Sequence, residues 1–266
     1  MPTDAEEDWI TAVNTAPTRI PRMGLENLVT IWMNVCESRS GTMASLIIPI
    51  PMNSTPIPAM MGVAATNVSE SFMAVANGTG KEGIQGIEER EEEIDLSNVR
   101  ISKKISKILV LDQTPKDVET LNRMYSILGN IERIGDHAMN LAEYAETIEQ
   151  KNLSFSGYAK KEFQVMEETC REGMELLRKA AEGNPEFKLS MAEEIEQRID
   201  DITLKFRQNQ IDRMREGNCN VESSILYSEM LTDYERIGDH MLNIAQAYAA
   251  IDWSGDRGQT AATAIA

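Results

Sequence analysis

Acidic residues spaced four positions apart are the feature of this 266-residue sequence that could do chemistry. Residues i and i+4 of a helix lie on one face, with Cβ atoms about 5–6 Å apart, so two carboxylates placed this way repel each other. A bound cation reverses the sign of that interaction, and clustered oxygen ligands suit iron, manganese, magnesium or calcium. The spacing therefore predicts a metal site, built from Glu91, Asp95, Glu132, Asp136, Glu196, Asp200, Glu235 and Asp239.

These pairs belong to an internal repeat. The letters ERIGDH occur at 132–137 and again at 235–240, an offset of 103 residues. Upstream, EEEIDLS at 91–97 matches EQRIDDI at 196–202 at an offset of 105. Each half of the chain thus carries the same two helices in the same order. A single pair could arise by chance among 43 acidic residues, but repetition at matching positions favours metal binding over solvated carboxylates.

A glycine lies inside each ERIGDH motif, at Gly135 and Gly238. Glycine within a helix costs about 1 kcal/mol relative to alanine, and it is tolerated where another backbone or a ligand must come close. Two interpretations are therefore open: tight packing between helices and access for a metal.

His137 and His240 directly follow the motif aspartates and are the two histidines of the chain. One residue turns a helix by about 100°, so each ring points away from the carboxylate face, and packing or hydrogen bonding around the site is favoured over ligation. Asn140 and Asn243 lie four residues after the aspartates and extend the polar face. We expect these four residues to support the metal ligands rather than bind metal themselves.

Other classes of site and partner are excluded by composition and spacing. Glu132 and His137 are five residues apart, whereas di-iron bundle proteins use Glu-x-x-His, and no phosphate-binding glycine loop or nucleophile elbow occurs. Cys36, Cys170 and Cys219 have no CxxC spacing, so neither a zinc knuckle nor a disulfide framework is predicted. The net charge of −17 would repel nucleic acid and suits cations or a basic protein surface.

Helices must position these residues, since three- and four-residue apolar spacing dominates and strand signals are weak. The predicted helices cover about 19–37, 82–110, 114–150, 157–183, 186–216 and 221–250. Thr114 and Pro115 mark a helix start, and Gly183 and Gly217 mark helix ends. The fold class is therefore all-α.

The repeat also predicts the domain organisation. An acidic tail at 1–18 precedes a first repeat at 19–150, a second repeat follows at 151–251, and a tail closes the chain at 252–266. If 19–37 is the first helix of repeat one, the first half holds roughly 33–38 extra residues. We assign them to an insertion at about 38–70, because this Pro- and Met-rich stretch is uncharged between Arg39 and Glu70 and its prolines argue against a continuous helix.

The expected location is the cytoplasm. The N-terminus MPTDAEEDW is acidic where a secretory signal would be basic and then apolar. The sequence also has no run of about 20 uninterrupted apolar residues, the length of a transmembrane helix.

Together, LGNIERIGDHAMNLAEYA and LTDYERIGDHMLNIAQAYA, each preceded by its own ExxxD helix, resemble the PhoU family of phosphate-uptake regulators and the PhoU-like regions attached to sodium/phosphate cotransporters. The resemblance implies two antiparallel three-helix bundles, with metal ions held by the ExxxD motifs. The metal would be multinuclear iron, with Mn, Mg, Zn and Ca as alternatives. It further implies self-association, as a dimer, and restraint of phosphate transport and phosphate signalling without catalysis. The partners would be a transporter component or its sensor kinase, with peripheral membrane association through the transporter.

Two alternatives to this regulatory role stay open. Carboxylates bridging metal ions on a helical bundle could form an enzyme, such as a phosphohydrolase or an oxidase. The acidic faces could also be merely solvated, in a helical interaction module that binds no metal.

Overall fold

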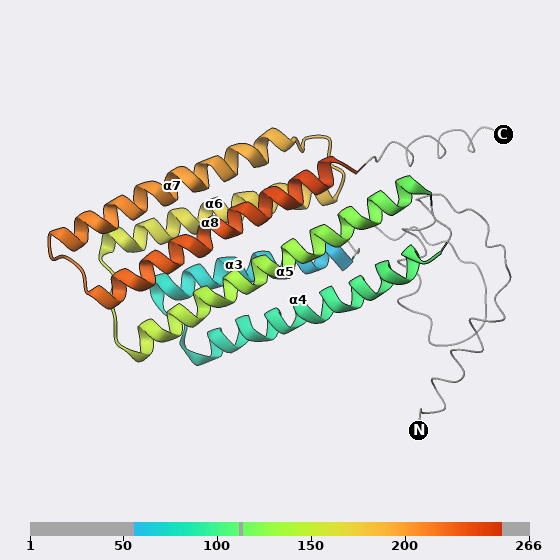
Figure 1. Cartoon of the computed structure of the whole chain (residues 1–266). Helices are drawn as coiled ribbons and strands as arrows, with labels where there is room; N and C mark the ends of the chain where they lie inside the picture. Colours follow the sequence, from blue (N-terminus) through green and yellow to red (C-terminus); the bar gives the residue numbers. More distant parts are fainter. Residues whose placement is uncertain (1–55, 112–113, 252–266) are drawn as a thin grey trace, which may run out of the picture.

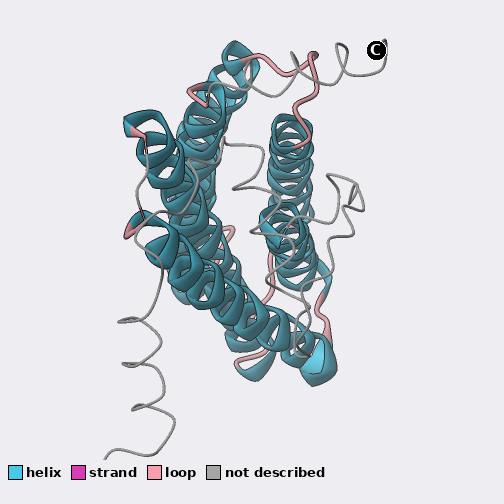
Figure 2. Cartoon of the chain, turned by 90° about the vertical axis from the view of Figure 1, so that its right-hand side faces the viewer, coloured by secondary structure: helices cyan, strands magenta, loops and turns pink. Residues whose placement is uncertain are grey.

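The computed structural model describes residues 56–111 and 114–251. This part of the chain folds into six helices and contains no strand (Figure 2), which confirms the all-α prediction. The helices are α3 (Pro56–Asn77), α4 (Gly80–Leu109), α5 (Pro115–Gln150), α6 (Gly157–Ala181), α7 (Leu189–Arg215) and α8 (Val221–Ala249).

The six helices form two antiparallel three-helix bundles (Figure 1). Helices α3, α4 and α5 pack on one another in the first bundle, and α6, α7 and α8 do so in the second. The bundles join where α5 packs on α8 and α3 packs on α6, so α4 and α7 lie at the outer edges. The fully buried side chains of α5 include Ile127, Leu128, Ile131 and Leu141, and those of α8 include Tyr234, Ile237 and Ile244.

Local sequence explains where these helices begin and end. Thr114 caps α5: its hydroxyl accepts a hydrogen bond from the backbone N–H of Asp117 at 3.2 Å, and the Asp117 carboxylate accepts one from the backbone N–H of Thr114 at 3.2 Å. Pro115 follows in the first turn, where a missing N–H costs nothing. Gly183 and Gly217 have φ of +64° and +71° just after α6 and α7, a conformation that glycine adopts without strain.

The predicted insertion at 38–70 is wrong for residues 56–70, which form most of α3. Pro56 and Pro58 lie in the first turn of this helix, where proline is tolerated. Residues 56–69 carry no charge because α3 is enclosed by α4, α5 and α6, and a helix enclosed in this way is apolar around much of its circumference. Its buried side chains include Ile57, Met60, Met61, Ala64, Val68 and Phe72.

The first bundle therefore starts at Pro56 in the described part of the chain, and α3 takes the place that α6 has in the second bundle. The endings VANG at 75–78 and AAEG at 180–183 align at the repeat offset of 105. No extra residues are needed inside the first bundle. The predicted helix at 19–37 and the rest of the predicted insertion, 38–55, lie outside the described residues.

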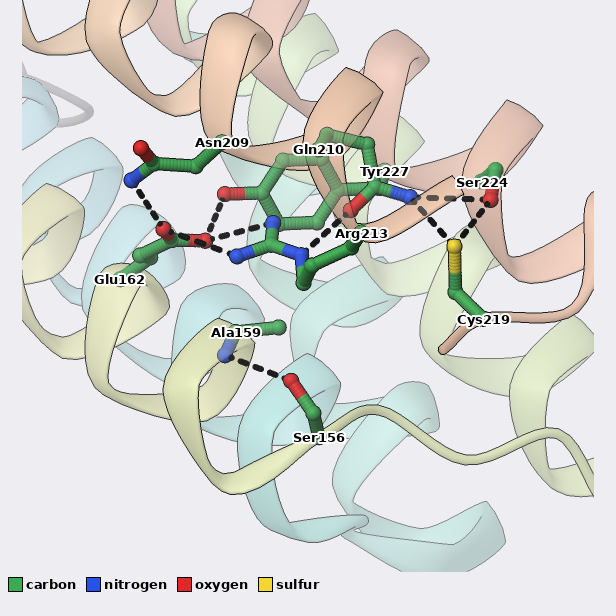
Figure 3. A network of polar contacts seen from close by, with 9 residues as sticks. All are labelled: Ser156, Ala159, Glu162, Asn209, Gln210, Arg213, Cys219, Ser224 and Tyr227. Carbon is green, nitrogen blue, oxygen red and sulfur yellow. Dashed lines mark hydrogen bonds and ion pairs between the residues drawn. The ribbon is translucent and has the colours of Figure 1, made fainter. Parts of the chain in front are cut away.

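A buried polar network ties the three helices of the second bundle together at one end (Figure 3). Arg213 of α7 donates two hydrogen bonds, of 3.0 and 2.8 Å, to the carboxylate of Glu162 at the start of α6. Tyr227 of α8 donates its hydroxyl to the same carboxylate, and Asn209 adds a bond of 2.8 Å. The repeat-equivalent positions of Arg213 and Tyr227 are apolar in the first bundle, so this network belongs to the second bundle alone.

Candidate functional site

The two motifs of each repeat meet through an isoleucine and a glycine. Ile94, between Glu91 and Asp95, packs so closely on Gly135 that a Cβ there would lie 3.2 Å from its Cδ1 atom. In the second repeat, a Cβ at Gly238 would lie 3.0 Å from both Cδ1 and Cγ2 of Ile199. Of the two interpretations of the glycines, the structure supports close helix packing. This packing also brings the ExxxD pair of one helix next to the pair of the other.

In the first repeat, the four motif carboxylates lie close enough to repel one another electrostatically. Partial burial raises the pKa of Glu91, and the charges of Asp95 and Asp136 raise it further. Burial and Asp136 raise the pKa of Glu132, while Arg133, 3.6 Å away, partly offsets this. Burial and Asp95 raise the pKa of Asp136. Carboxylates from α4 and α5 thus share a single region of negative potential.

The second repeat has the same arrangement but more internal neutralisation. Burial, Asp200 and Asp239 raise the pKa of Glu196. Arg236 approaches Asp239 at 2.9 Å, and Arg207 of α7 approaches Glu235 at 3.7 Å. Position 102, the repeat equivalent of Arg207, is a serine. The uncompensated negative charge is therefore concentrated in the first repeat.

The carboxylate side chains do not converge on one point. Within residues 56–111 and 114–251, no three His, Cys, Asp or Glu side chains are placed so that they could hold a single metal ion. In each repeat the fold supplies two neighbouring helices that carry motif carboxylates. All of these potential ligands are oxygen atoms, the ligand type that hard cations prefer.

The histidines lie where the two repeats meet. Their rings stack with centroids 5.5 Å apart, and burial together with the neighbouring His137 lowers the pKa of His240. Nδ1 of His137 lies 2.7 Å from Oδ1 of Asp233 on α8, and Nδ1 of His240 lies 2.9 Å from Oδ1 of Asn130 on α5. As expected from the helical turn, both rings point away from the carboxylate face.

The two motif asparagines follow the same cross-repeat pattern. Asn140 donates to Asp233 at 2.9 Å, and Asn243 donates to Asn130 at 3.2 Å. These contacts place all four supporting residues in the joint between α5 and α8. Their expected role in orienting metal ligands stays a prediction.

Sequence reasoning missed the partners in this joint. Asp233 and Asn130 each precede a motif histidine by seven residues, two turns of helix, so they occupy equivalent positions in the repeats. Asp233 is 6% exposed and accepts a further bond of 2.9 Å from the hydroxyl of Tyr144. A polar residue at the same place in both copies of an otherwise apolar stretch was the signal available in the sequence.

No helix in the described part of the chain combines the length and the apolar character needed to cross a membrane.

Comparison with known proteins agrees with this architecture. The family model described as the PhoU domain matches the chain twice, over residues 57–145 and 163–248. The phosphate-specific transport system accessory protein PhoU homolog 1 of Thermotoga maritima is 25% identical over 167 residues, which cover 62% of this chain and 70% of that protein. The two matched regions contain all four ExxxD pairs.

Solved structures show the same fold. PhoU from Pseudomonas aeruginosa superposes with a TM-score of 0.67 at 21% identity, covering 74% of this chain and 93% of that one. The phosphate transport system regulatory protein PhoU from Streptococcus pneumoniae gives a TM-score of 0.62 at 19% identity, with coverages of 74% and 91%. With two domain matches that together span more than half of its length, the chain belongs to the PhoU family.

Proposed function

We propose that this protein is a non-catalytic regulator of phosphate transport and of phosphate-starvation signalling in the cytoplasm. The observation that carries the proposal is the double match to the PhoU domain, with both motifs of each repeat packed against each other. The Thermotoga relative is named as an accessory protein of a phosphate-specific transport system. Its name supports a component of the phosphate transport system as the partner, and a sensor kinase coupled to that system is the alternative.

The experiment that tests this role is a gene deletion. In the organism that carries the gene, deletion should derange phosphate uptake or accumulation, and the intact gene supplied in trans should restore control. Normal phosphate accumulation in the deletion strain, in both rich and phosphate-limited medium, would contradict the proposal. Hydrolysis of a model phosphate ester by the metal-loaded protein would instead favour an enzyme.

The proposal includes metal binding by the ExxxD pairs. Eight carboxylates would provide the ligands, from α4 and α5 in the first repeat and from α7 and α8 in the second. The cation would supply positive charge that offsets repulsion within each set, and iron or manganese fits an oxygen-only donor set. The close packing of Ile94 on Gly135 holds α4 against α5, and that of Ile199 on Gly238 holds α7 against α8. These contacts fix the spacing between the two motifs of each repeat.

The two repeats are not equivalent as metal sites. Three carboxyls of the first repeat have raised pKa values, whereas Arg236 and Arg207 neutralise part of the second. We therefore expect the first repeat to bind a cation more tightly.

Thermal unfolding provides the test. Adding Mn²⁺ to protein treated with a chelator should raise the melting temperature, because a ligand that binds the folded state stabilises it. The rise should shrink more for Asp136→Asn than for Asp239→Asn. An equal rise in both variants and in the unmodified protein would contradict the assignment.

A further inference from the structure

Helix α4 has one face in the bundle and the opposite face exposed. Its buried side chains, Ile84, Ile87, Ile94, Ile101 and Ile105, recur at intervals of three, four and seven residues and pack the helix onto the first bundle. At the outer edge of the molecule, the other side of α4 is open (Figure 1). Positions spaced by three and four residues form a second seam there, which consists of Glu89, Glu92, Leu96, Val99, Lys103 and Ser106.

The exposed face is divided by charge. Glu88 and Glu92 lie in its first half, and Lys103 and Lys107 lie in its second half. None of these four side chains forms an ion pair with a residue in the described part of the chain. Between the two charged halves, Leu96 is 62% exposed and Val99 is 50% exposed, so two neighbouring aliphatic side chains lie together on this open helix face.

These residues are arranged symmetrically along the helix. They form pairs whose two members lie at equal distances from a point between residues 97 and 98, so that the two residue numbers of each pair add to 195. The pairs are Glu88 with Lys107, Glu92 with Lys103, and Leu96 with Val99. When two identical helices pack antiparallel about a two-fold axis at that point, equidistant residues of the two copies come to the same height. Glu88 and Glu92 would then each face a lysine of the other copy, Glu89 would face Ser106, and the aliphatic pair would meet at the centre.

We propose that the exposed face of α4 is a self-association surface, on which a second copy of this chain packs with its own α4 antiparallel. Family resemblance implies self-association without naming a surface; the residues of α4 supply one. Charge complementarity sets the register, and Leu96 and Val99 supply the apolar contact. Asp95 and Arg100 are related by the same symmetry, so the interface would border the carboxylates of the first repeat.

Helix α7 shows that the pattern is not a general property of the edge helices. It too is acidic in its first half and basic in its second, as the helix dipole favours. If two copies of α7 packed antiparallel about the equivalent point, between residues 202 and 203, Glu193 would lie opposite Asp212 and Asp201 opposite Leu204. Its arginines are also engaged within the chain: Arg207 pairs with Glu235, Arg213 with Glu162, and Arg215 with Asp212.

Charge reversal on α4 tests the register. Lys103→Glu places a carboxylate opposite Glu92 twice in the dimer, and Glu92→Lys places two lysines opposite each other twice. Each single variant should raise the dissociation constant of the dimer at least about tenfold, because like charges at an interface are strongly unfavourable. Combining both changes exchanges the charges and should restore association. Gln208→Glu, at the position of α7 equivalent to Lys103, is the matched control and should leave the dimer intact.

Sedimentation velocity of the full chain over a range of concentrations gives the readout, with circular dichroism to verify that each variant keeps its helices. The unmodified protein should reach twice the monomer mass of 29.7 kDa and should dissociate more readily in high salt. A monomer at all concentrations, single variants that associate normally, or a double variant that stays dissociated would overturn the proposal.

Phosphatidylserine vesicles test whether the lysine half of this face binds an anionic lipid surface instead of a second copy. Vesicle binding that is lost in Lys103→Glu and not regained in the double variant would assign this face to a lipid surface instead. None of these variants alters an ExxxD residue of the metal proposal, so the two proposals can fail independently.

Discussion

Replacing the motif glycines by alanine tests the packing that holds the carboxylate helices together. Alanine favours a helix interior by about 0.5–1 kcal/mol over glycine, so an unhindered position would gain that much stability. At Gly135 the new methyl group would lie 3.2 Å from Cδ1 of Ile94, whose side chain is fully buried. Overpacking of this kind costs about 1–3 kcal/mol, so Gly135→Ala should lower the free energy of unfolding by about 1 kcal/mol net.

The second repeat should respond more strongly. At Gly238 the methyl group would meet both Cδ1 and Cγ2 of Ile199 at 3.0 Å. Rotation about the outer bond of the isoleucine can move Cδ1 but not Cγ2, so we expect a loss of about 2 kcal/mol for Gly238→Ala. Gly129, also within α5, has no atom within 4 Å of an added Cβ and is the control. Gly129→Ala should stabilise the protein by about 0.5–1 kcal/mol.

The assay is urea unfolding of the metal-free protein, followed by circular dichroism, with the free energy obtained by linear extrapolation. Ile94→Val removes the Cδ1 atom and alone should cost about 1 kcal/mol, but it should cost less in the Gly135→Ala background, since it relieves the contact. If Gly135→Ala and Gly238→Ala stabilise the protein as much as Gly129→Ala does, the helices can pack without glycine at these positions, and the proposed role of the two glycines is refuted.

Three further predictions concern the second bundle and the joint between the repeats. Arg213→Ala should lower the free energy of unfolding by about 3–5 kcal/mol, because it leaves the buried carboxylate of Glu162 without its ionic partner, and Glu162→Gln in the same chain should recover part of that loss in urea unfolding. Asp233→Ala should cost about 3 kcal/mol in the same assay, because three partly buried donors lose their acceptor, and a cost below 1 kcal/mol would show that water replaces it. Burial raises the pKa of the Cys170 thiol, so a thiol reagent should modify partly exposed Cys219 in the native protein but leave Cys170 untouched until the chain unfolds, as peptide mass mapping would reveal.

Much of the fold could be predicted because its signals are local and repeated. Three features depend only on residues a few positions apart: the cap at Thr114, the glycine after α7 and the apolar spacing of α5. Each lies where the sequence predicted it. The two copies of ERIGDH then related one bundle to the other. Repetition in the sequence thus carried the long-range information that a single amphipathic helix lacks.

Helix α3 could not be predicted in the same way. It lacks the charged face that marks an amphipathic helix, because other helices surround it, and its first turn contains Pro56 and Pro58. Those residues resemble a loop unless the enclosing helices are known. The partners of His137 and His240 were also out of reach, since Asp233 and Asn130 lie about 100 residues away on the other repeat.

Metal content is the most direct test of the central claim that the paired carboxylates bind cations. The protein would be purified without chelators, dialysed against Mn²⁺ or Fe²⁺, and analysed for metal per chain alongside Asp136→Asn, Asp239→Asn and the control Asp201→Asn, an exposed neighbour of the motif residue Asp200. Bound metal should be present in the unmodified protein and in the control, reduced in Asp239→Asn, reduced further in Asp136→Asn, and absent when both motif aspartates are changed. Equal metal content in all of these proteins, or none in the unmodified one, would contradict the account.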